Sequence, residues 1–193
     1  KLDVTDEVSV EAAVRDVIAQ CGAIDVVVNN AGYGLMGPFE AQTDAQIRRQ
    51  FDCNLFGVMN VTRAVLPHMR ARKQGRIVNV GSAAGRLTLP LYSAYCATKW
   101  ALEGFSEALW LETRQHNIKV KIIEPGMIKT DFFDRSREMA TKPGLTAYDD
   151  FIAAVTPNLE AWEAAGAEPE VVARSIWRAS TSIWPRLRYH PNA

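Results

Sequence analysis

The fold is decided by the stretch Arg76-Ile77-Val78-Asn79-Val80-Gly81-Ser82, in which a run of β-branched residues stops at a glycine and a serine. Such a run predicts a strand that is buried on both faces, as strands of parallel sheets are. The same design occurs twice more, where residues 24–28 run into Asn29-Asn30-Ala31-Gly32 and residues 119–123 run into Glu124-Pro125-Gly126. We therefore expect three parallel strands that each end in a turn.

Long helical segments separate these predicted strands. Thr5 or Asp6 can cap a first helix, which Gly22 ends. Helical spacing of apolar residues returns over residues 44–72 and 93–116. Strands that alternate with long crossover helices predict an α/β fold with a doubly wound parallel sheet. Ligands bind such sheets beyond the carboxyl ends of the strands, which is where the three turns lie.

The overall composition narrows the possible classes of protein. The chain has 193 residues, 48% of them hydrophobic, which suffices for one domain with a buried core. Its 22 basic and 22 acidic residues balance, so bulk charge indicates no nucleic acid and no anionic membrane as a partner. The sequence contains no apolar run long enough for a membrane span and no signal peptide.

The cysteines and histidines indicate neither a disulfide framework nor a metal site. Three scattered cysteines, Cys21, Cys53 and Cys96, predict reduced thiols in a cytoplasmic protein. The three histidines lie far apart in the sequence and form no metal-ligand spacing, so we expect no metal.

A tyrosine and a lysine stand four residues apart in Tyr92-Ser93-Ala94-Tyr95-Cys96-Ala97-Thr98-Lys99. On a helix this spacing places both side chains on one face, one turn apart. A lysine ammonium beside a phenol favours the phenolate, so we expect the pKa of Tyr95 to fall below its usual value of about 10. Such a phenol suits general acid/base chemistry on an alcohol or a carbonyl. By itself the pair also fits an exposed helix surface, so the surrounding residues must decide.

A second pattern, Gly32-Tyr33-Gly34-Leu35-Met36-Gly37, matches the G-x-G-x-x-G of a dinucleotide-binding turn. That turn requires a helix directly after it, and then a strand that ends in an acidic residue about 20 positions on. Here Pro38 follows at once, and helical spacing continues until Gly75, so we reject the match. We predict a flexible loop beside a substrate pocket instead.

Residues 130–169 have a weaker pattern than the rest of the chain. They carry a Pro143-Gly144 pair and five aromatic residues, which are Phe132, Phe133, Tyr148, Phe151 and Trp162. A long insertion after a strand end favours a substrate lid, while a helical subdomain with an ordinary aromatic core fits equally well. Residues 170–182 then predict a surface helix that closes the sheet, and residues 186–193 carry no predicted closing element.

Together these features resemble the short-chain dehydrogenase/reductase family. Ser82 precedes Tyr95 by 13 residues, and Asn54 follows Asn30 by 24, as in that family. The resemblance covers nearly the whole chain and implies a single Rossmann-like domain over residues 1–193, with a substrate lid at 130–169. The residues that carry it are Asn30-Ala31-Gly32, Asn54, Ser82, Tyr95, Lys99, Pro125-Gly126 and Thr130.

The resemblance implies an oxidoreductase that transfers a hydride between NAD(P)(H) and a ketone or secondary alcohol. Tyr95 would be its general acid/base, Lys99 would lower the pKa of Tyr95 and bind the nicotinamide ribose, and Ser82 would stabilise the substrate oxygen. Asn54 would hold a water-mediated proton relay to the lysine. The implied cofactor-binding residues are Asp3, Val4, Asn30, Ala31, Gly32, Tyr95, Lys99, Pro125, Gly126 and Thr130.

The chain departs from the family at its start. Family members open with a strand and a Gly-rich turn that binds the pyrophosphate, whereas Leu2-Asp3-Val4 resembles the end of the family's third strand. We therefore expect a truncated sequence, whose sheet lacks its first two strands and is incomplete at the C-terminus as well. The residues that select NAD or NADP would follow the missing second strand, so either cofactor fits, with a slight preference for NADP.

The expected partners are a small-molecule carbonyl or alcohol and further copies of the chain. Apolar residues at 33–36 and 87–91 favour a lipophilic substrate of steroid, retinoid or acyl type. Two long predicted helices keep apolar residues on more than one face, and family members pair such helices between subunits, which implies a homodimer or homotetramer. Two other functions fit the same residues, namely an epimerase or dehydratase with this Tyr/Lys pair and an NAD(P)-sensing or scaffold protein without turnover.

Overall fold

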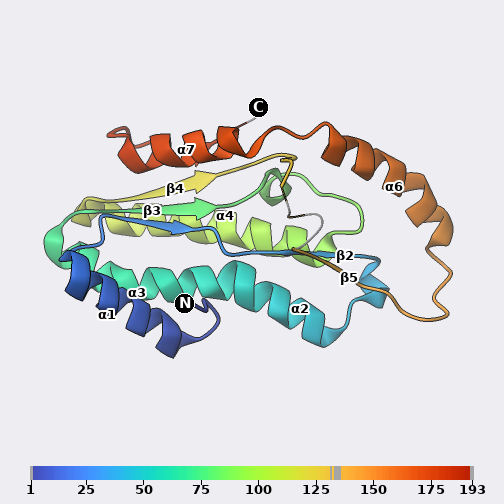
Figure 1. The fold of residues 1–193 in the computed structure, drawn as a ribbon, viewed down its shortest axis with the longest axis horizontal. Coiled ribbons are helices and arrows are strands. Elements are labelled where there is room, and N and C mark those ends of the chain that lie inside the picture. Colours follow the sequence, from blue (N-terminus) through green and yellow to red (C-terminus); the bar gives the residue numbers. More distant parts are fainter. Residues whose placement is uncertain (1, 131, 133–135, 192–193) are drawn as a thin grey trace.

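The computed structural model of the chain describes residues 2–130, 132 and 136–191. Its centre is a parallel four-stranded sheet in the order β1 (Val26–Asn29), β3 (Gly75–Val80), β4 (Ile118–Ile123) and β6 (Arg188–Tyr189) (Figure 1). This confirms the predicted α/β fold and its three strands. The expectation that residues 186–193 hold no closing element is wrong, because β6 pairs with β4.

Helices cover both faces of this sheet (Figure 1). Their bounds are α1 (Glu7–Cys21), α3 (Gly57–Arg72) and α4 (Ser93–Thr113) on one face, and α7 (Pro169–Thr181) on the other. Of the two predicted caps, Thr5 and Asp6, it is Asp6 that caps α1 through its carboxylate, and Gly22 ends α1 in the left-handed conformation as predicted. The predicted surface helix after residue 169 is confirmed as α7.

The central strands are buried on both faces, as their composition predicted. Ile77 and Val120 face the core beneath α3 and α4, whereas Val78 and Ile123 face the core beneath α7. Burial of each such side chain contributes about 1.5–3 kcal/mol. Because both faces are apolar, this hydrophobic pattern does not by itself choose the register between strands.

A buried polar chain supplies the missing register information. Asn29 Nδ2 donates to Asn79 Oδ1 at 2.8 Å, and Asn79 Nδ2 donates to Ser106 Oγ at 2.8 Å. Asn29 and Asn79 also stand opposite each other in the β1–β3 ladder. A slipped strand would leave these amides buried without partners, at a cost of about 1–3 kcal/mol each. The chain of amides therefore holds β1, β3 and α4 in one arrangement.

The first long helical region of the prediction contains an irregular turn. α2 (Asp44–Phe51) begins at a capping box formed by Thr43 and Gln46. It runs through a π-helical turn (Asp52–Phe56) directly into α3. The turn contains Asn54, a residue with poor helix propensity.

Residues 34–36 form a strand and not the predicted flexible loop. β2 (Gly34–Met36) is buried and pairs in parallel with β5 (Arg137–Met139). The N–H of Leu35 also donates to Gln50 Oε1 at 2.7 Å, which holds β2 against α2. A strand of three residues is too short to show a periodicity, and its partner lies a hundred residues away in sequence. Gly37 is followed by a short 3-10 turn (Phe39–Ala41) and not by an α-helix, which agrees with the rejection of a dinucleotide-binding turn.

The insertion after β4 contributes β5 and α6 (Asp149–Ala164). Leu159 of α6 is buried in a cluster with Met36 and Tyr92 near the carboxyl edge of the sheet. Phe132 packs against that cluster, whereas Phe151 and Trp162 are exposed. Phe133 lies outside the described residues.

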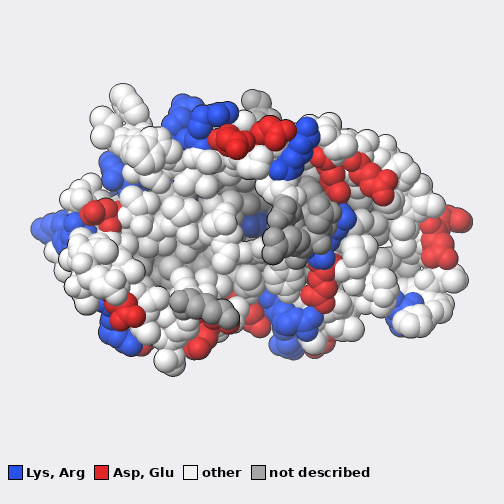
Figure 2. Space-filling model, viewed as in Figure 1, with Lys and Arg blue, Asp and Glu red and all other residues white. Residues whose placement is uncertain are grey.

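The surface beside β1 is apolar. β1 is an edge strand of its sheet, and Figure 2 shows a wide uncharged area between α1 and α7. A groove of about 430 Å³ lies between α1, β1 and α3, and valines from all three elements line it.

The cysteines are free, with Cys21 exposed, Cys53 partly buried and Cys96 buried. Within the described ranges, no helix combines the length and the apolar character needed to cross a lipid bilayer.

Gly37→Ala tests the close approach of β2 to the chain that follows β5. Gly37 has a φ of 145°, and a Cβ there would collide with the Ala140 carbonyl oxygen. We expect the substitution to lower the free energy of unfolding by about 2–4 kcal/mol in urea denaturation. Gly104→Ala in α4 is the matched control, since a Cβ added there would meet nothing within 4 Å, and it should stabilise by about 0.5–1 kcal/mol. Equal stability of the two variants would contradict the proposed clash.

Candidate active site

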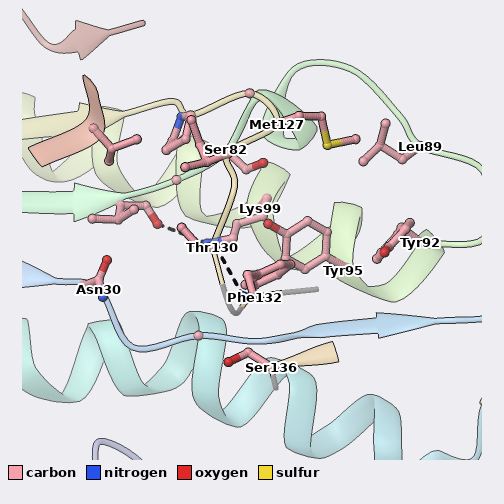
Figure 3. A pocket seen from close by; sticks show the side chains of 17 residues that line it. Asn30, Ser82, Leu89, Tyr92, Tyr95, Lys99, Met127, Thr130, Phe132 and Ser136 are labelled. Atoms are coloured by element: carbon pink, nitrogen blue, oxygen red, sulfur yellow. Dashed lines mark hydrogen bonds between the residues drawn. The ribbon is translucent and has the colours of Figure 1, made fainter. Parts of the chain in front are cut away.

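The carboxyl ends of β1, β3 and β4 open into one pocket of about 380 Å³ (Figure 3). Eight of the residues singled out in the sequence line it together, namely Asn30, Gly32, Ser82, Tyr95, Lys99, Pro125, Gly126 and Thr130. The remaining lining is largely apolar and comes from the loop before α4, the chain after β4 and α7. The topology therefore joins segments that lie a hundred residues apart in the sequence.

α4 places Tyr95 and Lys99 side by side in this pocket, as their spacing predicted. Both side chains are buried, each with 7% of its surface exposed. Lys99 Nζ donates to the Val80 carbonyl oxygen at 3.0 Å and lies 5.7 Å from the centre of the Tyr95 ring. The ammonium is therefore anchored to the carboxyl end of β3.

Burial governs the protonation of this pair. It raises the pKa of Tyr95 to about 12, and the nearby Ser82 hydroxyl opposes the shift only in part. It lowers the pKa of Lys99 from 10.5 to about 8, against the opposing influence of Cys53 and Glu103. The expected lowering of the Tyr95 pKa by Lys99 is therefore not what this structure gives. The sequence pattern indicates that the two side chains are neighbours, but it does not indicate how completely the fold removes them from water.

Ser82 stands at the turn between β3 and α4. Its Oγ accepts from the N–H of Ala84 at 3.1 Å and caps a short 3-10 turn. The N–H of Ala83 donates to the Pro125 carbonyl oxygen at 2.7 Å, so the turns after β3 and β4 are bonded to each other. The serine hydroxyl thus lies beside the tyrosine on a backbone that two strands hold.

Two aromatic rings pack around the Tyr95 phenol. The Tyr95 ring lies 5.8 Å from that of Tyr92 in an edge-on arrangement and 6.0 Å from that of Phe132. All three rings line the pocket. They exclude water around the phenol and give one side of the pocket an apolar wall.

Asn54 lies beneath the pocket and not on its wall. Its Oδ1 accepts from the N–H of Tyr33 at 3.1 Å, and its Nδ2 donates to the Tyr33 carbonyl at 2.9 Å. Asn54 is 1% exposed and would contact any Cβ added at Gly32. The π-helical turn therefore supports the turn after β1 by binding its backbone.

The remaining predicted cofactor residues lie outside the main pocket. Val4 and Ala31 line the neighbouring groove beside β1, which Asn30 also reaches. The Asp3 carboxylate accepts from the N–H and the hydroxyl of Thr5 at 2.9 and 2.8 Å. Asp3 lines neither of these two cavities.

Several lining residues were not recognised in the sequence as part of a site. Met127, Ile128, Ser136 and Val172 reach the pocket from the chain after β4 and from α7. Apolar residues at such positions have the same sequence pattern as core residues, so no local signal distinguishes them.

Buried carboxylates lie behind the site and were also missed. Glu124 directly precedes Pro125, and Glu103 follows Lys99 by one helical turn. Arg188 Nε lies 3.0 Å from Glu103 and 3.3 Å from Glu124, and thereby joins β6 to both. Sequence reasoning could have noted only that Glu124 interrupts an apolar strand end.

Comparison with known proteins gives a consistent result. The family model described as short chain dehydrogenase matches residues 1–141. An uncharacterised oxidoreductase of Schizosaccharomyces pombe is 39% identical over 189 residues, which cover 98% of this chain and 79% of that protein. Retinol dehydrogenase 8 of Bos taurus is 36% identical over 201 residues, which cover 100% of this chain and 63% of the relative.

Solved structures agree with the sequence relatives. A short-chain dehydrogenase from Streptomyces avermitilis superposes with a TM-score of 0.85 at 36% identity, over 98% of this chain and 68% of that one. A metagenomic short-chain oxidoreductase in complex with NADP superposes with a TM-score of 0.62 at 34% identity, over 64% of this chain and 57% of its own.

Lys99→Met tests the cost of burying the ammonium. Because the folded-state pKa of Lys99 is about 8 and its ordinary value 10.5, the unfolded chain holds this proton more tightly. The wild-type protein therefore bears the full cost below pH 8 and loses it as the pH rises to 10.5. We expect the variant to be more stable by roughly 1–3 kcal/mol at pH 7, with the gain fading toward pH 10.5.

Urea denaturation at several pH values measures this difference. Lys142→Met is the control, because that side chain is exposed and its loss should give no pH-dependent gain. A constant difference between Lys99→Met and wild type from pH 7 to 10.5 would show that the ammonium is not penalised by burial.

Proposed function

The chain belongs to the short-chain dehydrogenase/reductase family, and we propose that its pocket transfers a hydride between NAD(P)(H) and a ketone or secondary alcohol. As a member of this family it is an NAD(P)-dependent oxidoreductase. The observation that carries the specific proposal is the convergence of Ser82, Tyr95 and Lys99 on a single pocket with an apolar wall.

Tyr95 is proposed as the general acid and base. Its raised pKa keeps the phenol protonated through the neutral range, so it is ready to donate a proton to a carbonyl oxygen. The reverse reaction needs the phenolate and is therefore favoured at higher pH. The reduced nicotinamide supplies the hydride to the carbonyl carbon when it is bound.

Ser82 and Lys99 are proposed to act on the two sides of Tyr95. The Ser82 hydroxyl donates to the substrate oxygen and stabilises the negative charge that develops there. The Lys99 ammonium, held by Val80, contributes positive charge to the site and binds the ribose hydroxyls. Positively charged and hydroxyl donors in a water-excluded pocket act more strongly than they would in water.

The residues on the polar side of the pocket fit the nicotinamide half of a dinucleotide. Gly32 and Gly126 leave the backbone open to a closely approaching ring, and Asn30 and Thr130 offer polar atoms. A structural relative at 34% identity is a complex with NADP. We propose NAD or NADP as the cofactor, with a slight preference for NADP.

Asn54 is proposed to support a proton relay to Lys99. The Asn54 side chain hydrogen-bonds both the N–H and the carbonyl of Tyr33. Its Nδ2 also lies 3.4 Å from the hydroxyl of Thr98, the residue before Lys99. In this role it acts by holding the turn after β1 close to α4. Val4 and Ala31 are proposed to contact the rest of the cofactor from the neighbouring groove, and Asp3 remains a proposed adenine contact.

A lipophilic substrate is proposed from the opposite wall. Leu89, Met127 and Phe132 meet there, and α6 covers the apolar cluster behind them as a lid would. Retinol dehydrogenase 8, a relative at 36% identity, bears a name that refers to a lipophilic alcohol.

Tyr95→Phe and Ser82→Ala test this function. Each should lower kcat/KM for carbonyl reduction by at least about 100-fold, because proton transfer or charge stabilisation at the oxygen is lost. The assay uses the full-length protein, a panel of aliphatic and cyclic ketones, and the absorbance of reduced nicotinamide.

Tyr148→Phe is the matched control, since that phenol contacts Glu40 outside the pocket and its loss should leave the rate unchanged. Turnover that survives Tyr95→Phe would refute the mechanism. Nucleotide binding without turnover of any substrate would favour a sensor or scaffold protein.

A homodimer or homotetramer is proposed through the helices behind the site. Phe56 in the π-helical turn and Trp100 in α4 are about half exposed, although they lie on elements that form the pocket. Gel filtration should give two or four times the mass of one chain, and Phe56→Glu with Trp100→Glu should shift it toward the monomer. A wild-type monomer would contradict the proposal.

A further inference from the structure

We propose that Arg137 is a positioning residue that, with Glu163 and Tyr92, fixes the apolar wall of the substrate pocket. In this view it sets the affinity for the carbonyl substrate and leaves the affinity for the nucleotide unchanged. The inference rests on the function proposed above for that pocket.

The first observation is a half-buried ion pair between β5 and α6. Arg137 donates to Glu163 Oε1 at 2.8 Å, and the two side chains are only 23% and 17% exposed. Among the described residues, the other contacts that hold α6 are apolar, from Ile152, Val155 and Leu159 to the cluster beneath. Apolar packing is non-directional, so the ion pair is the contact that fixes how α6 lies against β5.

The second observation is the environment of Tyr92. Its ring lines the pocket and packs edge-on against Tyr95, while its hydroxyl is fully buried. Within the described residues, that hydroxyl has no partner of ordinary hydrogen-bond geometry. Burial raises the pKa of the Tyr92 phenol, and the neighbouring Arg137 guanidinium opposes that shift more than any other group. Arg137 also donates to Met36 Sδ at 3.9 Å, and Met36 belongs to the same buried cluster as Tyr92.

The third observation is the strained backbone at Leu91, directly before Tyr92. Leu91 has a φ of 66°, a left-handed conformation that is unfavourable for a residue with a Cβ. The Leu91 carbonyl accepts from the N–H of Gly37 at 2.8 Å, which ties this turn to the end of β2. Such strain persists where the surrounding structure over-determines a position, and here that position is the ring beside Tyr95.

These contacts form a chain from α6 to the reactive phenol. Glu163 holds Arg137, Arg137 contacts Met36 in the cluster that contains Tyr92, and Tyr92 packs on Tyr95. Figure 3 places Tyr92 and Leu89 on one side of Tyr95 and Asn30 on the other. The chain therefore acts on the apolar end of the pocket, away from the residues proposed to bind the nucleotide. Without these contacts, the substrate would have to order this wall when it binds, and its affinity would be lower.

The test measures substrate and nucleotide KM separately in the full-length protein. Arg137→Gln and Glu163→Gln should each raise the KM for a lipophilic ketone about fivefold, while kcat and the KM for the nucleotide change less than about twofold. Tyr92→Phe, which keeps the ring, should raise the ketone KM less. The double variant Arg137→Gln/Glu163→Gln should be no worse than either single variant, because both remove the same contact.

Arg49→Gln is the matched control. Arg49 pairs with Glu138, the next residue of β5, at the same 2.8 Å, but the two side chains are 55% and 32% exposed and lie away from the pocket. Its KM values should equal those of wild type. If Arg137→Gln and Arg49→Gln behave alike, or if Arg137→Gln raises the ketone and nucleotide KM together, the inference is overturned.

Hydrogen exchange decides the matter without turnover. Arg137→Gln should increase amide exchange in residues 149–164, whereas Arg49→Gln should not. Faster exchange in Arg137→Gln alone supports the role of the Arg137–Glu163 ion pair in holding α6. It does so even if the wild-type protein reduces no carbonyl, in which case only the proposed function fails. Unchanged exchange in residues 149–164 refutes the role of the Arg137–Glu163 ion pair in holding α6.

Discussion

The hydrogen bond from Lys99 Nζ to the Val80 carbonyl is the constraint on which the site depends. A buried ammonium must find acceptors, and here it finds one at the last residue of β3. That requirement seats α4 against the carboxyl end of the central strand. Tyr95 and Ser82 then meet because one lies a turn before the lysine and the other directly follows the strand. Burial in this pocket raises the pKa of Tyr95 and lowers that of Lys99.

Much of this arrangement could be predicted from the sequence. β-branched runs that end in small residues revealed the three strands, and helical spacing revealed the crossovers between them. Because parallel strands present their carboxyl ends at one edge, the turns at Asn30, Ser82 and Pro125 had to converge, and all three line the pocket. The spacing of Tyr95 and Lys99 predicted that the two side chains are neighbours on one face of α4.

The remainder depends on contacts between distant segments. β2 has three residues and is recognisable only through β5, and β6 has two and is recognisable only through β4. Arg137 and Glu163 look like ordinary surface charges until β5 and α6 bring them together in a half-buried position. The direction of the Tyr95 pKa shift also depends on how deeply the phenol is buried, with the rings of Tyr92 and Phe132 packed on it, which no spacing of residues encodes.

The π-helical turn has a consequence for how such a chain changes through mutation. It adds one residue to a helix that would otherwise be regular, so α2 and α3 are out of phase with each other by about 100°. Loss of one of the residues Asp52, Cys53, Leu55 or Phe56 would restore the regular helix and rotate Asn54 away from the Tyr33 backbone that it binds. Asn54 and Tyr33 would both remain in the sequence, but the hydrogen bonds between them would be lost. The number of residues in this turn therefore matters to the site as much as their identity does.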